Sequence, residues 1–382
     1  MISPVSRERI TPRDGPIAPL KEDAVEDLTR MADMREAAAV DREAFRDTGM
    51  PLHELFVASR AGFLIGVKSG GKVVAEKALL FDACGGIYSM TTGVSTVLQS
   101  RGLGTLMAAE SIKRARVAGS GVVYSHVSPL NGPQLNSYLN KLDFVAAAIF
   151  TDYFGEADYG LGSHRLLIRK DLKAEDGRRG QRPELSVDVR DTEALEGAFR
   201  DGFEAYQLIR CEGGPMLGFR RAEHPYAKGV SGIHMPSDSG DGIRPITTTM
   251  EFRDALKLEG EAFSPPSTIY FVKSMAFVGI AFGAFSDGAL RGYGGVILDG
   301  KDGAYVHGPF TGVDDMRQAD ALISAAQEIA AKAGRKRLWT VIPGSWRRED
   351  GFLEKNGFRA GYVAEMLFDD SDGRIWSKEL TD

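Results

Sequence analysis

The chain has 382 residues, a formal net charge of −6 and only two cysteines, Cys84 and Cys211. This length predicts two domains of roughly 150 to 200 residues, because a single hydrophobic core does not usually grow so large. The acidic balance argues against nucleic acid as a partner, and two distant cysteines indicate neither a disulfide framework nor a zinc site. No signal peptide and no apolar run of about 18 residues is present, so we expect a cytoplasmic protein without membrane contact.

The first elements along the chain are a helix over Met34–Phe45 and a strand-turn-strand hairpin over Phe63–Asp82. A further strand is predicted over Gly86–Val94 and a helix over Leu103–Ala118. Between them lies the turn QSRGLG, Gln99 to Gly104. A turn in this position presents the beginning of a helix to a ligand.

Gly102 and Gly104 are the residues of this turn that indicate a possible binding site. Glycine allows positive φ and a close approach of the backbone, while the free N–H groups of the first helical turn converge on one point. The positive end of the helix dipole favours an anion there, so the turn predicts a phosphate site that needs no lysine. The alternative is a turn with a purely structural role. The dinucleotide pattern G-x-G-x-x-G and the Walker loop are both absent here.

At this point the sequence resembles the GCN5-related N-acetyltransferases. Their acyl-CoA loop reads (Arg/Gln)-x-x-Gly-x-(Gly/Ala), and a valine stands five residues before it, as Val94 does here. A predicted strand over Gly121–Ser128 and a second motif come next in the family's order, with Asn131, Lys141 and Phe144 at matching positions. The resemblance implies acetyl-CoA as cosubstrate, no metal, and CoA contacts from Thr92, Gly93, Val94, Gln99, Ser100, Arg101, Gly102, Leu103, Gly104, Thr105 and Asn131.

The family's second motif also contains a tyrosine, which protonates the departing CoA thiolate. Counting forward from Asn131 places Tyr138 at that position, whereas counting back from Phe144 places Leu139 there. One residue is therefore inserted between the two ends of the motif. The resemblance implies Tyr138 as the general acid, and the alternative is a tyrosine packed within a helix.

No acidic residue lies on the strand that leads to the loop, where many family members carry their general base. His126 on the following strand titrates near neutral pH and is one candidate, although a lone strand histidine can equally be structural. Glu76 and Asp82 on the preceding hairpin are further candidates, and we expect them to face solvent or position the substrate. A water relay without a dedicated base is another alternative.

The chain repeats itself. MREAAAVDREAF from Met34 matches FRDALKLEGEAF from Phe252 at an offset of 218, and two further segments match at offsets of 217 and 214. The second copy lacks the four residues that form the glycine turn and instead places Asp314, Asp315 and Asp320 near the helix start. Carboxylates there would repel a diphosphate. His307, on what we take as the counterpart of the His126 strand, is a relic or a binding residue.

The predicted fold is therefore α/β (α+β), with two tandem acetyltransferase-like domains, each a mixed, mostly antiparallel sheet flanked by helices. The first domain covers residues 1–172. A polar linker follows over 173–184 and an extension over 185–242, and the degenerate second domain covers 243–382. In the extension we expect a strand over Ser186–Asp191, a helix over Thr192–Tyr206 and a broken stretch over Gly213–Gly218. We expect it to pack the two domains together; a substrate lid or a dimer arm is the alternative.

The function predicted from these features is direct acyl transfer from acyl-CoA, by default acetyl-CoA, to the amine of a small molecule. Two alternatives stay open. The chain could be a CoA-binding sensor or scaffold without transferase activity, as the missing strand carboxylate suggests, or a decarboxylase that acts on acyl-CoA with His126. Neither nucleic acid nor membrane is expected as a partner, and a homodimer is as compatible with the sequence as a monomer.

Overall fold

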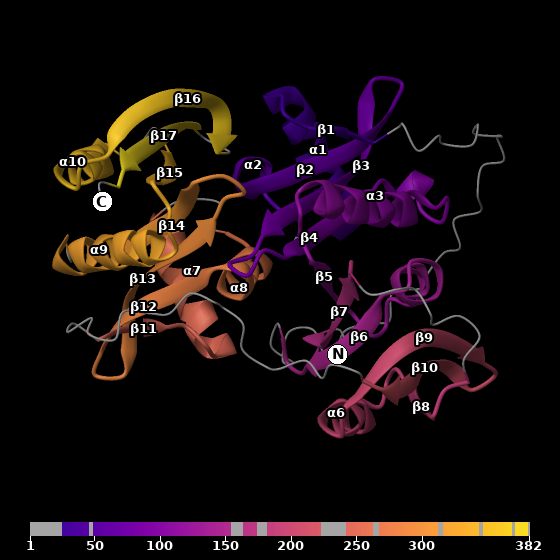
Figure 1. Cartoon of the computed structure of the whole chain (residues 1–382). Helices are drawn as coiled ribbons and strands as arrows, with labels where there is room; N and C mark the ends of the chain where they lie inside the picture. The colour runs from indigo at the N-terminus through magenta and orange to yellow at the C-terminus, as the bar shows by residue number, and fades with distance from the viewer. Residues whose placement is uncertain are drawn as a thin grey trace, which may run out of the picture.

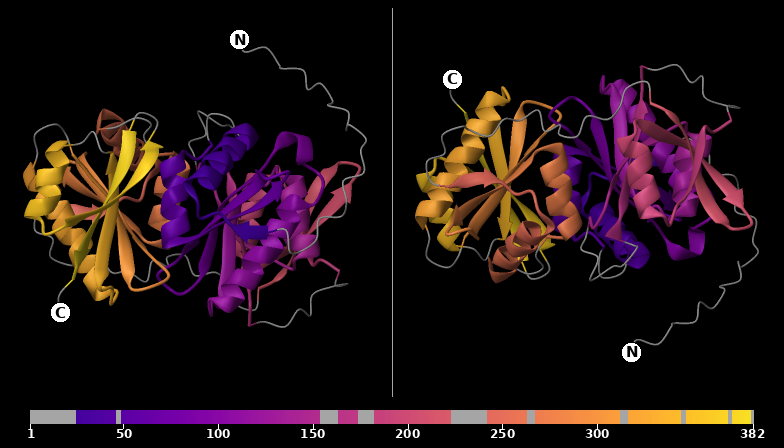
Figure 2. Two further views of the ribbon diagram at one scale, coloured as in Figure 1. Left: turned by 90° about the horizontal axis from the view of Figure 1, so that it is seen from above. Right: turned by 90° about the horizontal axis from the view of Figure 1, so that it is seen from below.

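The computed structural model describes residues 25–45, 49–153, 163–173, 182–222, 242–262, 267–311, 316–343, 347–368 and 371–380. In this part of the chain two mixed sheets are each flanked by helices, which confirms the predicted α/β class. Seen from above and below, the second sheet, the first sheet and the extension lie one after another in a row (Figure 2). Most of the predicted linker, residues 174–181, lies outside the described residues, and so do residues 314 and 315.

The first sheet has ten strands in the order β1-β2-β3-β4-β5-β7-β6-β9-β10-β8. They are β1 (Val25–Asp27), β2 (Gly62–Ser69), β3 (Lys72–Phe81), β4 (Ile87–Val94), β5 (Val122–Val127), β6 (Val145–Phe150), β7 (Arg165–Asp171), β8 (Leu185–Asp188), β9 (Phe203–Cys211) and β10 (Gly214–Arg221). The strands predicted around β4 and β5 are confirmed within one residue at each end.

Two groups of helices cover the two faces of the first sheet (Figure 1). One core joins the sheet to α1 (Met31–Phe45) and α2 (Leu52–Ala61). The other joins it to a second group: α3 (Leu103–Val117), α4 (Gly132–Leu135), the π-helical turn η4 (Asn136–Lys141) and α6 (Thr192–Arg200). Side chains of a strand alternate between these faces, so neighbouring residues belong to different cores.

The second sheet has seven strands in the order β11-β12-β13-β14-β15-β17-β16, which repeats the order β1-β2-β3-β4-β5-β7-β6. They are β11 (Ile243–Pro245), β12 (Ile280–Ser286), β13 (Ala289–Leu298), β14 (Gly303–Thr311), β15 (Arg337–Pro343), β16 (Arg359–Phe368) and β17 (Ser371–Glu379). Its helices are α7 (Thr249–Ala262), α8 (Ile269–Val278), α9 (Met316–Lys332) and α10 (Arg347–Lys355). In the described residues both halves also share one parallel strand pair, β4 with β5 and β14 with β15.

The extension differs from its prediction. The helix predicted to reach Tyr206 ends at Arg200, because Gly202 takes a φ of +82° and turns the chain into strand β9. The stretch predicted as broken forms strand β10. The described part of the extension does not lie between the two sheets: β9 pairs with β6 through Ala205 and Ala146 and lengthens the first sheet.

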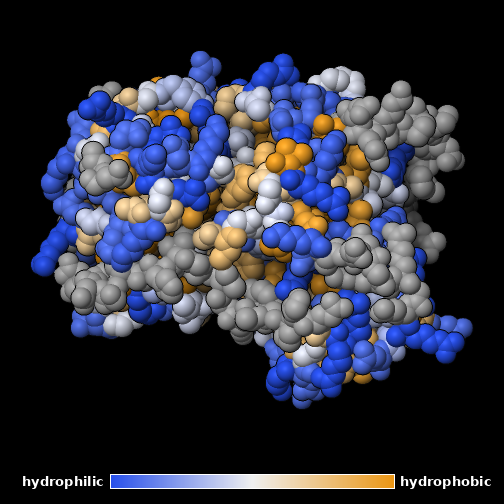
Figure 3. All heavy atoms as spheres, viewed as in Figure 1, coloured by the Kyte–Doolittle hydropathy of each residue, from blue (hydrophilic) through white to orange (hydrophobic). Residues whose placement is uncertain are grey.

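Two short apolar helices, α2 and α8, were not predicted, and they join the two halves. α2 of the first half contacts β14 and β16, and α8 of the second half contacts β4. The N–H of Ala83 also donates to the carbonyl of Val278 at 3.1 Å. One continuous core therefore contains Leu55 and Phe56 together with Phe271. Figure 3 shows apolar side chains reaching the surface in the middle of this face, between two mainly hydrophilic ends.

Candidate active site

The strands β4 and β5 pair over only three residues and then part. The ladder ends at Ser89 and Ser125, and the register between β4 and β3 shifts at the same place, leaving Met90 as an extra residue. Such a bulge bends a strand and redirects the residues beyond it. Backbone groups of β4 beyond Ser89 that face β5 consequently have no partner in the sheet and can pair with an extended ligand.

The predicted turn lies directly after the free end of β4. Gly102 has a φ of +87° and is the N-cap of α3, and its carbonyl accepts the first helical hydrogen bond from Leu106 at 2.9 Å. A Cβ built on Gly102 or on Gly104 would meet nothing within 4 Å. The first N–H groups of α3 are without an intrahelical partner, and the two glycines leave room beside them for an anion to approach.

A carboxylate on α1 holds the entry to this turn. Glu43 accepts hydrogen bonds from the backbone N–H of Thr96 at 2.7 Å, from the hydroxyl of Ser95 at 3.1 Å and from the hydroxyl of Thr96. These bonds, led by that of the Thr96 hydroxyl, lower the pKa of Glu43. Glu43 was not predicted as part of the site.

The other predicted CoA contacts surround the turn. The side-chain amide of Gln99 donates to the carbonyl of Val94 at 3.2 Å, and Arg101 is exposed. Thr105 shares a hydrogen bond of 2.7 Å with Ser137, which fixes the start of α3 against η4. Asn131 caps α4 by accepting from the backbone N–H of Gln134 at 3.2 Å.

Tyr138 lies in a π-helical turn, which explains the inserted residue of its motif. In η4 the N–H of Leu142 donates to the carbonyl of Ser137, five residues back, at 3.1 Å. A π-turn accommodates one residue more than an α-helical turn, so both anchors of the motif keep their places. The tyrosine that results from counting forward is the one directed at β3 and β4.

The buried phenol of Tyr138 contacts a lysine that the sequence did not single out. Lys77 on β3 is wholly buried, and its Nζ donates to Tyr138 Oη at 3.1 Å and to Thr92 Oγ1 at 2.6 Å. Burial raises the pKa of Tyr138, but the charge and the hydrogen bond of Lys77 outweigh it, so this pKa lies below its usual value. Tyr138, Lys77 and Thr92 belong to the α3 face of the sheet.

Glu76 does not face solvent, contrary to the sequence-based expectation, but is wholly buried on the opposite face. Its Oε1 accepts from the N–H of Gly93 at 2.6 Å, and its carboxyl contacts that of Asp41 on α1. A Cβ on Gly93 would lie 2.7 Å from Glu76 Oε1, so a larger residue here would displace the Glu76 carboxyl. Burial, and then the neighbouring acid, raise the pKa of Glu76 well above its usual value; burial also raises that of Asp41. The pair supports β4 after the bulge and does not have the exposure of a general base.

This carboxyl pair predicts a pH dependence of stability. Protonated carboxyls stabilise the fold fully below their unfolded pKa, and that contribution is lost as pH rises through the raised folded pKa. Glu76→Gln keeps the bond to Gly93 and donates an amide proton to Asp41, so the melting temperature should fall less between about pH 5 and about pH 8 than in the unchanged protein. Thermal unfolding monitored by circular dichroism checks this, and equal losses in both proteins would contradict it.

His126 is also buried, on the face that α8 covers. Its Nδ1 lies 3.0 Å from Tyr88 Oη, while its Nε2 has no hydrogen-bond partner among the described residues. Burial, with the positive charges of Arg165 and Lys273, lowers the pKa of His126 to about 3. The imidazole is therefore neutral at physiological pH and poorly suited to take a proton as a free base.

Aromatic rings from both halves surround His126. Phe277 of α8 lies 4.7 Å from the imidazole, ring centre to ring centre, and Tyr153 lies 5.0 Å from it. Two hydroxyls of α8 reach the same place: Ser274 donates to Tyr88 Oη at 3.3 Å, and Tyr270 lies 3.4 Å from it. The second half thus closes this side of the parted strands.

The two remaining candidates lie elsewhere. Asp82 accepts from the N–H groups of Cys84 and Gly86 at the turn before β4, away from the parted ends. His307 lies on β14, the counterpart of β4 in strand order, and the expectation that its strand is the counterpart of β5 is wrong.

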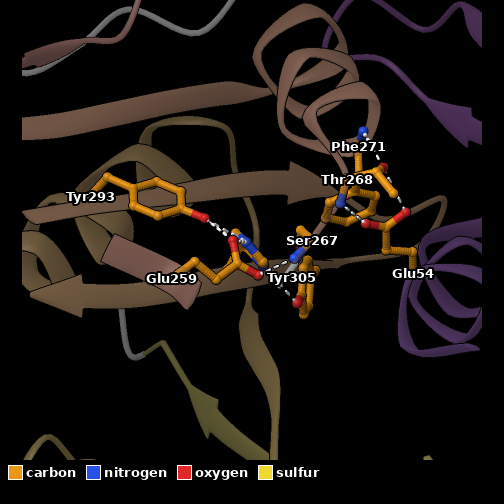
Figure 4. A network of polar contacts seen from close by, with 8 residues as sticks. Glu54, Glu259, Ser267, Thr268, Phe271, Tyr293 and Tyr305 are labelled. Atoms are coloured by element: carbon orange, nitrogen blue, oxygen red, sulfur yellow. Dashed lines mark hydrogen bonds and ion pairs between the residues drawn. The ribbon is translucent and has the colours of Figure 1, made fainter. Parts of the chain in front are cut away.

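His307 belongs to a buried polar network of the second half that includes Glu259, Tyr293 and Tyr305, which Figure 4 shows beside Glu54 of the first half. Its Nδ1 lies 3.2 Å from Tyr305 Oη and its Nε2 lies 3.3 Å from Glu259, which also accepts from Tyr293. Burial raises the pKa of Glu259, but His307 outweighs it and leaves this pKa below its usual value. Glu54 of α2 accepts from Thr268 beside this network, and burial raises its pKa well above the usual range. Buried polar side chains of the second half thus lie next to Glu54 of α2.

Within the described ranges no three His, Cys, Asp or Glu side chains are grouped so as to hold a metal ion. Cys84 and Cys211 are free and exposed. None of the helices in the described part is both long enough and apolar enough to span a membrane.

Known proteins resemble this chain in fold only. No family model and no curated protein matches it. Solved structures that resemble it include the ribosomal-protein-S18-alanine N-acetyltransferase of Escherichia coli, with 19% identity over 37% of this chain and 94% of that one, at a TM-score of 0.33. A Bacillus subtilis acetyltransferase in complex with CoA shows 16% identity over 36% of this chain and 98% of its own, at a TM-score of 0.32. A GNAT family acetyltransferase from Elizabethkingia anophelis with acetyl-CoA bound shows 16% identity over 36% of this chain and 97% of its own, at a TM-score of 0.31.

Proposed function

We propose that the first half of the chain transfers an acyl group, by default acetyl, from acyl-CoA directly to the amine of a small molecule. One observation carries this proposal: β4 leaves its pairing with β5 at Ser89 and leads to the N-terminus of α3, and Lys77 links the phenol of Tyr138 to Thr92 on this same end of β4. A diphosphate at the helix, an extended arm along β4 and a thioester near Tyr138 would use all three.

The chemistry derives from these groups. Free N–H groups of β4 beyond Ser89 would polarise the thioester carbonyl and stabilise the tetrahedral oxyanion. Tyr138 would protonate the departing thiolate. Glu76 and Asp41 are wholly buried, so we assign proton removal from the amine to a water relay, with neutral His126 as a hydrogen-bond partner of the acceptor.

The second half, in this proposal, is a second acetyltransferase-like domain without CoA-binding function. Its sheet repeats the strand order of the first, but its sequence lacks the glycine turn between β14 and α9. Its part in the reaction is carried by α8, which supplies Tyr270, Ser274 and Phe277 to the side of the sheet from which the amine would enter.

We expect the combined change Tyr270→Phe and Ser274→Ala to raise KM for the acceptor amine by roughly tenfold, because two hydrogen bonds around Tyr88 and His126 are lost. CoA affinity should stay unchanged, since α8 lies on the face opposite Tyr138. Steady-state kinetics and calorimetry separate the two effects. Tyr362→Phe, on the edge strand β16, serves as the control; a loss of CoA affinity with an unchanged KM for amine would refute this placement.

Thiol release from acetyl-CoA over a panel of small amines tests the proposed function. Amine-dependent release supports a transferase and excludes a pure sensor or scaffold. CoA binding without release from any amine favours the sensor. Release of CO₂ from malonyl-CoA without an amine would favour the decarboxylase alternative that uses His126.

A further inference from the structure

Lys77 is a cation in the interior of the first sheet. Its side chain is wholly buried, and none of the described acidic side chains forms an ion pair with it. Its strand neighbour Glu76 is directed to the other face, where it contacts Asp41. Buried charges are normally paired, because removing an ion from water is costly. A lysine retained in this place needs a compensating negative charge.

The ammonium group of Lys77 has three N–H donors, and the described residues use two of them, on Tyr138 Oη and on Thr92 Oγ1. Thr92 donates its own proton to the carbonyl of Thr91 at 2.8 Å, so it acts on Lys77 only as an acceptor. The lysine therefore links the phenol of Tyr138 to Thr92, on the end of β4 that is no longer paired with β5.

We propose that Lys77 is a positioning residue that, through Tyr138, makes this end of β4 a site for a thiolate, so that the enzyme binds the leaving group of the reaction in its anionic form. This inference rests on the proposed function and adds to it a binding preference for CoA over analogues without sulfur. Lys77 compensates the negative charge that passes between the sulfur and the phenol oxygen.

Atoms and electrons balance in this step. The amine nitrogen attacks the thioester carbon, the C–N bond forms, the C–S bond breaks and its electron pair goes to sulfur. The CoA thiolate formed in this way accepts a hydrogen bond from Tyr138 Oη, while that oxygen accepts one from Lys77 Nζ. The thiolate takes the proton of Tyr138 only as CoA leaves, and Lys77 Nζ then holds the tyrosinate. The proton lost by the acceptor nitrogen passes to water, and water returns a proton to Tyr138.

The acidic side chains on the elements packed against η4 are paired with arginines. On the elements packed against η4, Glu110 of α3 is paired with Arg114 at 2.7 Å, and Glu204 of β9 with Arg220 at 2.6 Å. α4 and β6 carry no titratable side chain. Tyr270 of α8 is a further titratable group that interacts with Tyr138. Among the residues that the structure describes, Lys77 is the charge that acts on the phenol of Tyr138, beside hydrogen bonds that involve Ser89 and Gln134.

The test compares the calorimetric Kd of CoA with that of desulfo-CoA between about pH 7 and about pH 9, across the range in which a thiol ionises. In the unchanged protein the preference for CoA should grow with pH, to roughly tenfold, because a charge-assisted hydrogen bond forms to the thiolate. Lys77→Met should remove this growth and leave the Kd of acetyl-CoA unchanged. Lys77→Arg should retain most of it.

Persistence of the full pH-dependent preference in Lys77→Met would overturn the inference while CoA binding, and with it the proposed function, stands. If Lys77→Met does not fold, as thermal unfolding would show, Tyr138→Phe replaces it and must lose the same preference; retention there overturns the inference equally. If the unchanged protein binds none of acetyl-CoA, CoA and desulfo-CoA, the proposed function itself fails, which is a distinguishable result.

Discussion

Gly102→Asp is expected to lower CoA affinity by about 100-fold or more, which corresponds to roughly 2.7 kcal/mol. A side chain at a φ of +87° strains the backbone by about 1–2 kcal/mol, which lowers the stability of the fold in the free and the bound protein alike, and a Cβ would meet no atom within 4 Å. The loss of affinity has another cause. The new carboxylate would stand at the N-terminus of α3, where it occupies the anion site and repels a diphosphate. Isothermal titration of CoA measures the loss.

The matched control is Gly119→Asp, at the other end of α3. Gly119 has a φ of +74° and equally open surroundings, so the substitution brings the same backbone strain and the same charge. We expect it to lower the melting temperature at least as much as Gly102→Asp does, because a carboxylate is unfavourable at a helix C-terminus, and to leave CoA affinity as it was. Equal effects of both variants on CoA binding would show that the turn does not form the phosphate site.

Tyr138→Phe is expected to reduce kcat by about 100-fold, the lower range for the loss of a general acid, with little change in the Kd of acetyl-CoA. In the unchanged protein kcat should fall at alkaline pH as Tyr138 loses its proton, and this fall should begin below the usual tyrosine range because Lys77 lowers the pKa of Tyr138. The variant should lack this alkaline limb. Stopped-time thiol assays over a pH series provide both quantities.

Tyr305→Phe is the control for this change. Tyr305 is as buried as Tyr138 and is bonded to His307, but it lies in the second half. A loss of turnover in Tyr305→Phe equal to that in Tyr138→Phe would mean that removing a buried hydroxyl perturbs the protein generally. Unchanged turnover in Tyr138→Phe would assign the acid role to another group.

Local patterns predicted the part of the site that depends on local geometry. The glycine turn, the strand before it and the helix after it depend on neighbouring residues, and they lie where the sequence places them. The inserted residue before Phe144 was visible as a mismatch in counting, but only the structure shows that a π-helical turn at Tyr138 absorbs it.

Residues whose role depends on tertiary packing were missed. Asp41 and Lys77 carried a signal in the sequence, since each is a charge on an otherwise apolar face: Asp41 comes after Met34, Ala37 and Ala38 at helical spacing, and Lys77 stands in the apolar strand β3. The contacts of such a charge could not be read from pattern, because Tyr138 lies 61 residues beyond Lys77 in the chain.

The contributions of α8 and of the extension could not be predicted from local sequence patterns either, because their contacts also join residues that are far apart in the chain. α8 reaches Tyr88 from 186 residues away, and β9 joins β6 across the sheet edge. The helix predicted through Tyr206 is an example of a helix prediction that fails at a single residue. Gly202 ends the helix, and the residues after Gly202 pair with β10 whatever their own helix preference.

A crystal structure of the protein with acetyl-CoA tests the central claim most directly. We predict the diphosphate on the N–H groups of Leu103, Gly104 and Thr105, the pantetheine arm paired with β4 beyond Ser89, and the sulfur within hydrogen-bond distance of Tyr138 Oη. Acetyl-CoA bound away from the N-terminus of α3, or no bound acetyl-CoA in crystals grown at saturating concentration, would contradict the assignment of the first half as the acyl-CoA site.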